Sequence, residues 1–236
     1  MHGMMGDIAM TINTEDLLNS ILDSLARIEY IKPEDIPNID LYMDQVTTFM
    51  DKRLRTTTRY PGDDKILTKT MINNYAKNDL LPPPERKKYS KEHMLLLIFI
   101  YYYKSILSIS DIQTLFRPIT EGFFYEKSGY KLEDVYSEVF GMEQGQVEML
   151  KEDVREKYRR AETSFADAPE KDQEFLKRFC FICQLSFDVY VKKLLIEKLV
   201  DDLREKDTRV TQKPAKTEKP VKQEKPAKPE KPDRSK

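Results

Sequence analysis

Apolar residues recur at three- and four-residue spacing along most of this 236-residue chain, which is the period of amphipathic helices. The stretch Thr14–Ile31 predicts a first helix whose apolar side comprises Leu17, Leu18, Ile21, Leu22, Leu25 and Ile28. Pro33 and Pro37 then force an extended link, and a second helix is expected from about Leu41 to Leu54. A polar loop, Arg55–Lys65, follows it.

Three further helices are expected in the middle of the chain. The first runs from Thr68, its N-cap, to about Asn78. The second, Ser90 to about Leu107, is apolar on almost every side and should therefore lie at the centre of the fold. The third, Ser108–Phe116, begins with Ser108 and Asp111 at the spacing of a capping box.

The C-terminal half predicts helices at Glu133–Phe140, Glu143–Phe165 and Pro169–Lys206. In the last helix, apolar residues alternate at spacings of four and three, which predicts a seam for a partner helix in the same chain or in a second copy. The seam positions are Phe175, Phe179, Ile182, Ser186, Val189, Lys193, Ile196, Val200 and Leu203. The residues expected to make a homodimer contact are Phe179, Ile182, Val189, Ile196 and Val200.

The last residues, Gln212–Lys236, repeat Lys-Pro and contain no aromatic residue. Such a segment cannot bury enough apolar area to offset its ordering entropy, so a disordered Lys/Pro-rich tail is expected over residues 207–236. Glycine is scarce, with 7 in the chain, which favours an all-α fold over a β-sandwich or barrel.

Residue types that carry catalysis or bind metals are poorly represented. His2 and His93 lie far apart, and Cys180 and Cys183 fall within an apolar helical stretch with no strand before them. There is no glycine-rich phosphate loop and no nucleophile elbow. We therefore expect no enzyme activity, no metal and no cofactor. No apolar run is long enough for a membrane span and no signal-peptide pattern is present, so a cytoplasmic location is expected.

Charge is unevenly distributed although the net charge is only −1. Residues 51–93 carry 11 basic and 6 acidic side chains, and residues 207–236 carry 10 basic and 5 acidic ones, so the remainder of the chain sums to −11. A basic band in an acidic protein points to contact with a polyanion at that band.

The basic band contains a candidate DNA-binding surface. On the helix that starts at Thr68, one side is apolar and faces the core, while Thr70, Asn73, Asn74 and Lys77 lie on another side. Asparagine can pair with the N6 and N7 edge of adenine in the major groove, and lysine and threonine can hold phosphates. Lys69 in the first turn is also placed for a phosphate.

The segment Leu80–Tyr89 predicts a wing beside this helix. Three prolines, Pro82 to Pro84, keep the chain extended, and Arg86, Lys87 and Lys88 follow at once. These side chains are expected to hold phosphates, so that binding to double-stranded DNA weakens steeply with salt.

The strings LTKTMINNYAKNDLLPP, KKYSKEHMLLLIFIYYYK and LSISDIQTLF resemble the winged helix-turn-helix of the mercury-resistance-regulator (MerR) type. Together with IDLYMDQVTTFMDKRL, they also resemble a bacterial family known as domain of unknown function 1836. The resemblance implies a bracing helix and linker at residues 14–39, a MerR-like winged helix at 40–120 and a helical domain at 121–206. The resemblance to these families implies a DNA-binding fold but no established biochemical role. From the residues we predict a DNA-binding transcriptional regulator that is homodimeric through the last helix. The alternative is a non-enzymatic helical interaction module that has lost DNA binding.

Overall fold

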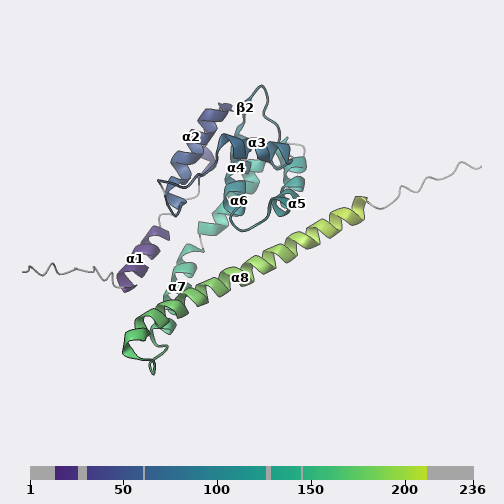
Figure 1. The fold of residues 1–236 in the computed structure, drawn as a ribbon. Helices are drawn as coiled ribbons and strands as arrows, with labels where there is room; N and C mark the ends of the chain where they lie inside the picture. Colours follow the sequence, from purple (N-terminus) through teal and green to yellow (C-terminus); the bar gives the residue numbers. More distant parts are fainter. Residues whose placement is uncertain (1–13, 26–30, 61, 126–128, 145, 212–236) are drawn as a thin grey trace, which may run out of the picture.

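A computed structural model describes residues 14–25, 31–60, 62–125, 129–144 and 146–211 (Figure 1). The helices are α1 (Thr14–Leu25), α2 (Met43–Leu54), α3 (Lys69–Lys77), α4 (Lys91–Tyr103), α5 (Ile109–Ile119), α6 (Leu132–Gln144), α7 (Val147–Glu162) and α8 (Glu170–Thr211). Two 3₁₀ turns, η1 (Pro33–Asp35) and η2 (Arg55–Thr57), and one π turn, η3 (Thr120–Phe124), join them. The strands are β1 (Leu41–Tyr42) and β2 (Lys88–Tyr89).

A compact body forms around α4, as its apolar sequence predicts. The run His93–Ile100 is buried throughout, and apolar side chains of α2, α3, α5 and α6 pack against it. This buried core begins at Ile31 and ends at Phe140. The Tyr136 hydroxyl donates a hydrogen bond to the Ile31 carbonyl at 2.7 Å, which joins the two ends of the core. We call residues 31–140 the body; its core extends beyond the expected 40–120 unit at both ends.

Two predicted helix starts are confirmed by their cap hydrogen bonds. Thr68 Oγ1 accepts a hydrogen bond from the Met71 backbone N–H at 3.2 Å at the start of α3. At α5, Ser108 Oγ accepts from the Asp111 N–H, and Asp111 Oδ2 accepts from the Ser108 N–H, both at 3.2 Å. These are the reciprocal bonds of a capping box, with aspartate in place of the usual glutamate.

The expectation of an all-α fold is incomplete, because β1 and β2 form a small antiparallel sheet. Leu41 pairs with Tyr89, and both side chains are buried in the core. The helix expected from Leu41 therefore begins at Met43. The Tyr42 backbone N–H, at the junction of strand and helix, donates to Gln45 Oε1 at 2.9 Å.

Outside the body, α7 and α8 form a helical hairpin, and α1 packs on it (Figure 1). The shared apolar cluster consists of Leu18, Leu22, Val154, Tyr158, Phe181 and Leu185. Beyond α7, α8 continues as a straight helix to α5 of the body. There Arg204 forms an ion pair with Asp111 at 2.8 Å. The hydrogen bond from Ser108, and then Arg204, lower the pKa of the Asp111 carboxyl.

The predicted seam of α8 divides into two parts. Val200 is buried, and Ile196 is half-buried against the core of the body. At these two positions the seam therefore packs within the chain, which was the alternative to a homodimer contact. The reason is that α8 passes from α7 to α5, and its buried side changes with its neighbour. Phe179, Ile182 and Val189, by contrast, are 52–62% exposed.

Two expectations fall partly outside the described residues. The first predicted helix ends at Leu25 in the structure, and residues 26–30 of its expected last turn lie outside the described residues. The tail predicted over residues 207–236 begins too early, because residues 207–211 form the end of α8; residues 212–236 lie outside the described residues. Among the helices that are described, none combines the length and apolar character of a membrane span.

Candidate nucleic-acid interface

Helix α3 presents its polar side to solvent. Ile72 and Tyr75 are buried beneath it, and burial raises the pKa of the Tyr75 hydroxyl. The side chains expected to meet DNA, namely Lys69, Thr70, Asn73, Asn74 and Lys77, are all exposed. Within the described part of the chain, the side chains of Asn73 and Lys77 make no hydrogen bond or ion pair, so their donors face water.

The end of α3 directs the chain toward the wing. Asp79 has a φ of 54°, in the left-handed region. The Leu80 N–H donates to the Tyr75 carbonyl at 2.9 Å, and the Asp79 N–H donates to the Ala76 carbonyl at 3.4 Å. This is a Schellman motif, which ends the helix and reverses the chain. Leu80 and Leu81 are buried directly after it, so the start of the wing is fixed to the core.

The tip of the wing is a tight turn formed by Glu85, Arg86, Lys87 and Lys88. The Lys88 N–H donates to the Glu85 carbonyl at 2.8 Å, and the two central residues have φ values of 49° and 66°. Positive φ at both central positions is the signature of a type I′ turn, in which Asn-Gly is strongly preferred. Here both positions carry exposed basic side chains.

The backbone of this turn is strained compared with the same turn built from glycine or asparagine. A residue with a Cβ in the left-handed region costs roughly 1–2 kcal/mol, a cost that glycine avoids. Arg86 and Lys87 both bear that cost, and within the described residues neither side chain makes a hydrogen bond or an ion pair. Backbone strain of this kind clusters at functional sites, where the side chain itself is required. The geometry therefore singles out these two cations.

Two of the expected phosphate-binding lysines are already engaged inside the chain. Lys69 forms an ion pair with Asp44 in the first turn of α2. Lys88 is half-buried, and its ammonium lies over the ring of Tyr42, 5.3 Å from the centroid. Tyr42 is exposed, and the pairing of β1 with β2 brings it beside the wing. Because that pairing joins distant parts of the chain, the sequence did not predict Tyr42 at this surface.

A buried histidine holds the exit of the wing. His93 is 3% exposed, and its Nδ1 accepts a hydrogen bond from the Ser90 N–H at 3.0 Å. Its ring contacts Tyr89 and Phe124 edge-on, at centroid distances of 5.4 and 4.8 Å. Burial lowers the pKa of His93, against the opposing influence of the Pro83 and Pro82 carbonyls and of nearby carboxylates. The neutral ring therefore ties β2 to α4 and η3.

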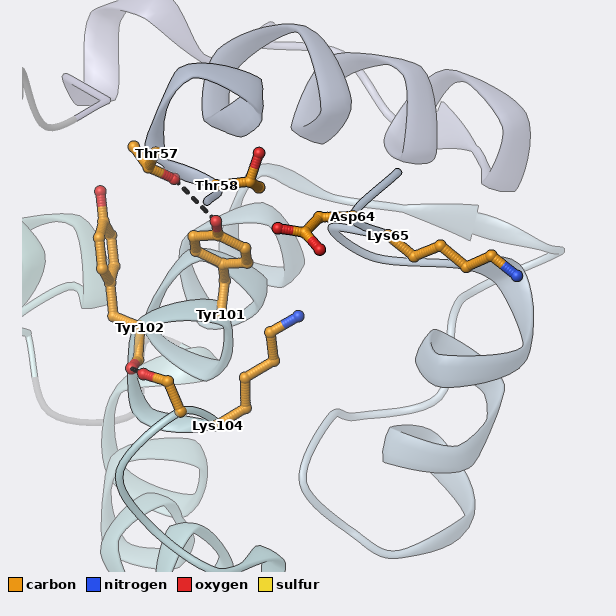
Figure 2. Close-up of a pocket in the computed structure, with 8 residues that line it drawn as sticks. Thr57, Thr58, Asp64, Lys65, Tyr101, Tyr102 and Lys104 are labelled. Atoms are coloured by element: carbon orange, nitrogen blue, oxygen red, sulfur yellow. Dashed lines mark hydrogen bonds between the residues drawn. The ribbon is translucent and has the colours of Figure 1, made fainter. Parts of the chain in front are cut away.

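A second feature near α3 is the hollow of about 470 Å³ between α4 and the loop after α2, shown in Figure 2. Lys104 donates to the Ile66 carbonyl at 2.6 Å and lies over the Tyr101 ring at 4.8 Å. Burial lowers the pKa of this ammonium. The Tyr101 hydroxyl bonds Thr57 Oγ1 at 2.7 Å, while Thr57 donates to the Leu54 carbonyl. Both hydroxyl protons are therefore used in hydrogen bonds within the chain. Together with the Lys104 bond to the Ile66 carbonyl, these contacts fix the loop that leads into α3.

The described residues offer no cluster of three or more histidine, cysteine, aspartate or glutamate side chains that could hold a metal ion. Cys180 is half-buried and Cys183 is exposed on α8, and neither has such partners beside it.

Comparison with known proteins gives a family for the body. Residues 31–139 match the family model described as Domain of unknown function (DUF1836). A search of curated proteins and of solved structures finds no match to the chain. The matched range coincides with the buried core from Ile31 to Phe140 and excludes α1, α7 and α8. The chain therefore contains a DUF1836 domain that occupies residues 31–139 and forms its body.

Proposed function

We propose that this chain is a DNA-binding transcriptional regulator whose body acts as a MerR-like winged helix-turn-helix. The observation that carries the proposal is the strained wing turn, which presents Arg86 and Lys87 at the end of a segment that begins directly after the exposed polar side of α3. Two cations in conformations that favour glycine are best explained by a polyanionic ligand. The basic balance of residues 51–93 supports the same ligand.

In this proposal, α3 enters the major groove of double-stranded DNA. Asn73 and Asn74 read base edges, with the bidentate amide contact to adenine as the natural pairing. Thr70 and Lys77 hold phosphates on either side of the groove, and Arg86 and Lys87 reach the phosphates next to it. Lys69 and Lys88 contribute positive charge, although Asp44 and Tyr42 already engage them.

The test is fluorescence anisotropy of the full chain on random duplex DNA at several salt concentrations, followed by selection of bound sequences. We expect affinity to fall steeply with salt. Lys87→Ala should weaken binding to all sequences alike and reduce the slope of log K against log salt by about 1. Asn73→Ala should cost about 1–3 kcal/mol at one base pair of the selected site and little elsewhere.

A matched control is Lys171→Ala, which removes one exposed positive charge at the start of α8, away from α3. It should leave both affinity and salt slope unchanged. Failure of the purified chain to bind duplex DNA at low salt contradicts the proposal, and so does a Lys171→Ala effect equal to that of Lys87→Ala.

The second candidate is a helical protein-interaction module without enzymatic activity. Two observations favour it: the ion pair that engages Lys69, and the net charge of −11 outside the two basic segments. This candidate predicts no salt-dependent DNA binding and a stoichiometric complex with a partner protein that bears a basic surface. Anisotropy on DNA therefore separates the two functions.

A further inference from the structure

The hollow between α4 and the loop after α2 has the size of a small-molecule site. Its volume is about 470 Å³, and such sites range over about 300–1,000 Å³. Tyr101 and Tyr102 line it from α4, while Thr58 and Asp64 line it from the loop. Aromatic walls with a few polar groups are typical of pockets that bind metabolite-sized molecules.

Four hydroxyl groups of the hollow already use their protons within the chain. The hydrogen bonds of Tyr101 and Thr57 are described above. Thr58 Oγ1 and Ser105 Oγ each donate to the backbone carbonyl three residues earlier, at 2.8 and 3.0 Å. These four groups therefore offer no proton to a ligand.

Two charged groups of the hollow keep unused hydrogen-bonding capacity. The Lys104 ammonium has three N–H donors, of which one binds the Ile66 carbonyl, and it forms no ion pair with any described residue. Asp64 Oδ2 accepts from the Tyr60 N–H at 2.9 Å, whereas Oδ1 makes no hydrogen bond in the described part of the chain. Figure 2 shows the ammonium and the carboxylate both pointing into the hollow. Each charge is half-buried, which is unfavourable for a charge that lacks a partner.

Two other cations near the hollow do not supply that partner. Arg55 forms an ion pair with Asp51 and donates to the backbone carbonyl of Asp64, at 2.9 Å, rather than to its carboxylate. Lys65 is exposed, and its ammonium points away from the hollow in Figure 2. The hollow therefore presents one available ammonium and one available carboxylate that do not pair with each other.

We propose that this hollow binds an α-amino acid in its zwitterionic form. The ligand's carboxylate accepts hydrogen bonds from Lys104, and its ammonium donates to Asp64. A simple anion gains the attraction of Lys104 but is repelled by Asp64, and a simple amine meets the reverse, so the pair selects a ligand with both charges. Ile66, whose carbonyl binds Lys104, lies two residues before the Thr68 cap. A ligand held by Lys104 therefore lies beside the segment that positions α3.

The experiment begins with thermal unfolding of the full chain, without DNA, in the presence of each of the standard amino acids. The amino acid that raises the unfolding midpoint most is then titrated into the chain by calorimetry. We expect it to bind about tenfold more tightly than its N-acetyl derivative, which lacks the ammonium, and than its amide, which lacks the carboxylate.

Three variants locate these preferences in the hollow. Asp64→Asn should abolish the preference for the free amino acid over the N-acetyl derivative, and Lys104→Met should abolish the preference over the amide. Lys65→Met is the matched control, because it removes an ammonium beside Asp64 that points elsewhere, and it should preserve both preferences. Asparagine can still accept from the Tyr60 N–H, so Asp64→Asn decides the matter if Lys104→Met does not fold.

The proposal is overturned if no amino acid raises the unfolding midpoint. It is also overturned if the N-acetyl derivative binds the wild-type chain as tightly as the free amino acid, in favour of a site for simple anions. Because DNA is absent from these measurements, failure of amino-acid binding and failure of DNA binding are observed separately.

Discussion

The body and the α7–α8 hairpin use apolar residues in opposite ways. In the body, His93–Ile100 of α4 are all buried, and the polar side of α3 is what faces water. In α8, large apolar side chains such as Phe187 and Leu195 are 66% and 58% exposed. The body therefore buries its apolar side chains, whereas α8 leaves many of its own exposed to water. A helix can be as apolar as a core element and still lie at the surface.

The largest expected difference between the two regions is the cost of removing a leucine. Leu97→Ala in α4 should lower the free energy of unfolding by about 2–5 kcal/mol, because it leaves a cavity in a fully buried site. Leu195→Ala should change it by less than about 0.5 kcal/mol at concentrations where the chain is monomeric. Urea denaturation measures both. An equal loss of unfolding free energy in both variants would contradict the contrast between the two regions, because it would mean that Leu195 is buried in the fold.

The wing turn should trade stability against binding. Arg86→Asn combined with Lys87→Gly should raise the free energy of unfolding by about 1–2 kcal/mol, because Asn-Gly suits the type I′ turn. The same variant should lose affinity for duplex DNA in the anisotropy assay. The control is Arg86→Gln with Lys87→Gln, which removes both charges but keeps a Cβ at each strained position. Its affinity for duplex DNA should fall, while its free energy of unfolding should not rise.

A smaller gain is expected at the end of α3. Asp79→Gly should stabilise the chain by about 0.5–1 kcal/mol, because glycine adopts the left-handed conformation of this Schellman motif without strain. Thermal unfolding checks it against Asp79→Ala, which keeps a Cβ and should give no gain. Stabilisation by both variants would show that the Asp79 carboxylate, rather than its backbone, is unfavourable.

The smallest expected effect is a pH dependence of the free energy of unfolding that comes from His93. Its folded-state pKa lies below the unfolded value of about 6.5, so the unfolded chain binds more protons as pH falls. This contribution to stability is full above pH 6.5 and is lost as the pH falls below it. Urea denaturation at pH 7.5 and 5.5 should show a larger loss for the wild-type chain than for His93→Gln. An identical loss in both would assign the pH dependence to other groups.

Sequence reasoning succeeded where the determining contact is local. The Thr68 cap and the Ser108–Asp111 box each join residues three apart, so their spacing contains all the information needed. The central position of α4 followed from its lack of a polar side. The exposure of Asn73 and Asn74 followed from the burial of Ile72 and Tyr75 on the same short helix.

Sequence reasoning failed where the contact is distant. The pairing of Leu41 with Tyr89 joins segments separated by α2 and α3, and no local pattern indicates it. In α8, apolar periodicity gave a seam but could not show that α5 covers Val200 while leaving Leu199 open. The positive φ values of Arg86 and Lys87 were missed because these residues seldom occupy such positions.

The hydrogen bond between Tyr136 and Ile31 brings the entrance and the exit of the body together. A unit whose two ends meet behaves as a cassette: sequence can be added before it or after it without rearranging its interior. Helix α1 on one side and the α7–α8 hairpin on the other are joined to the body in this way.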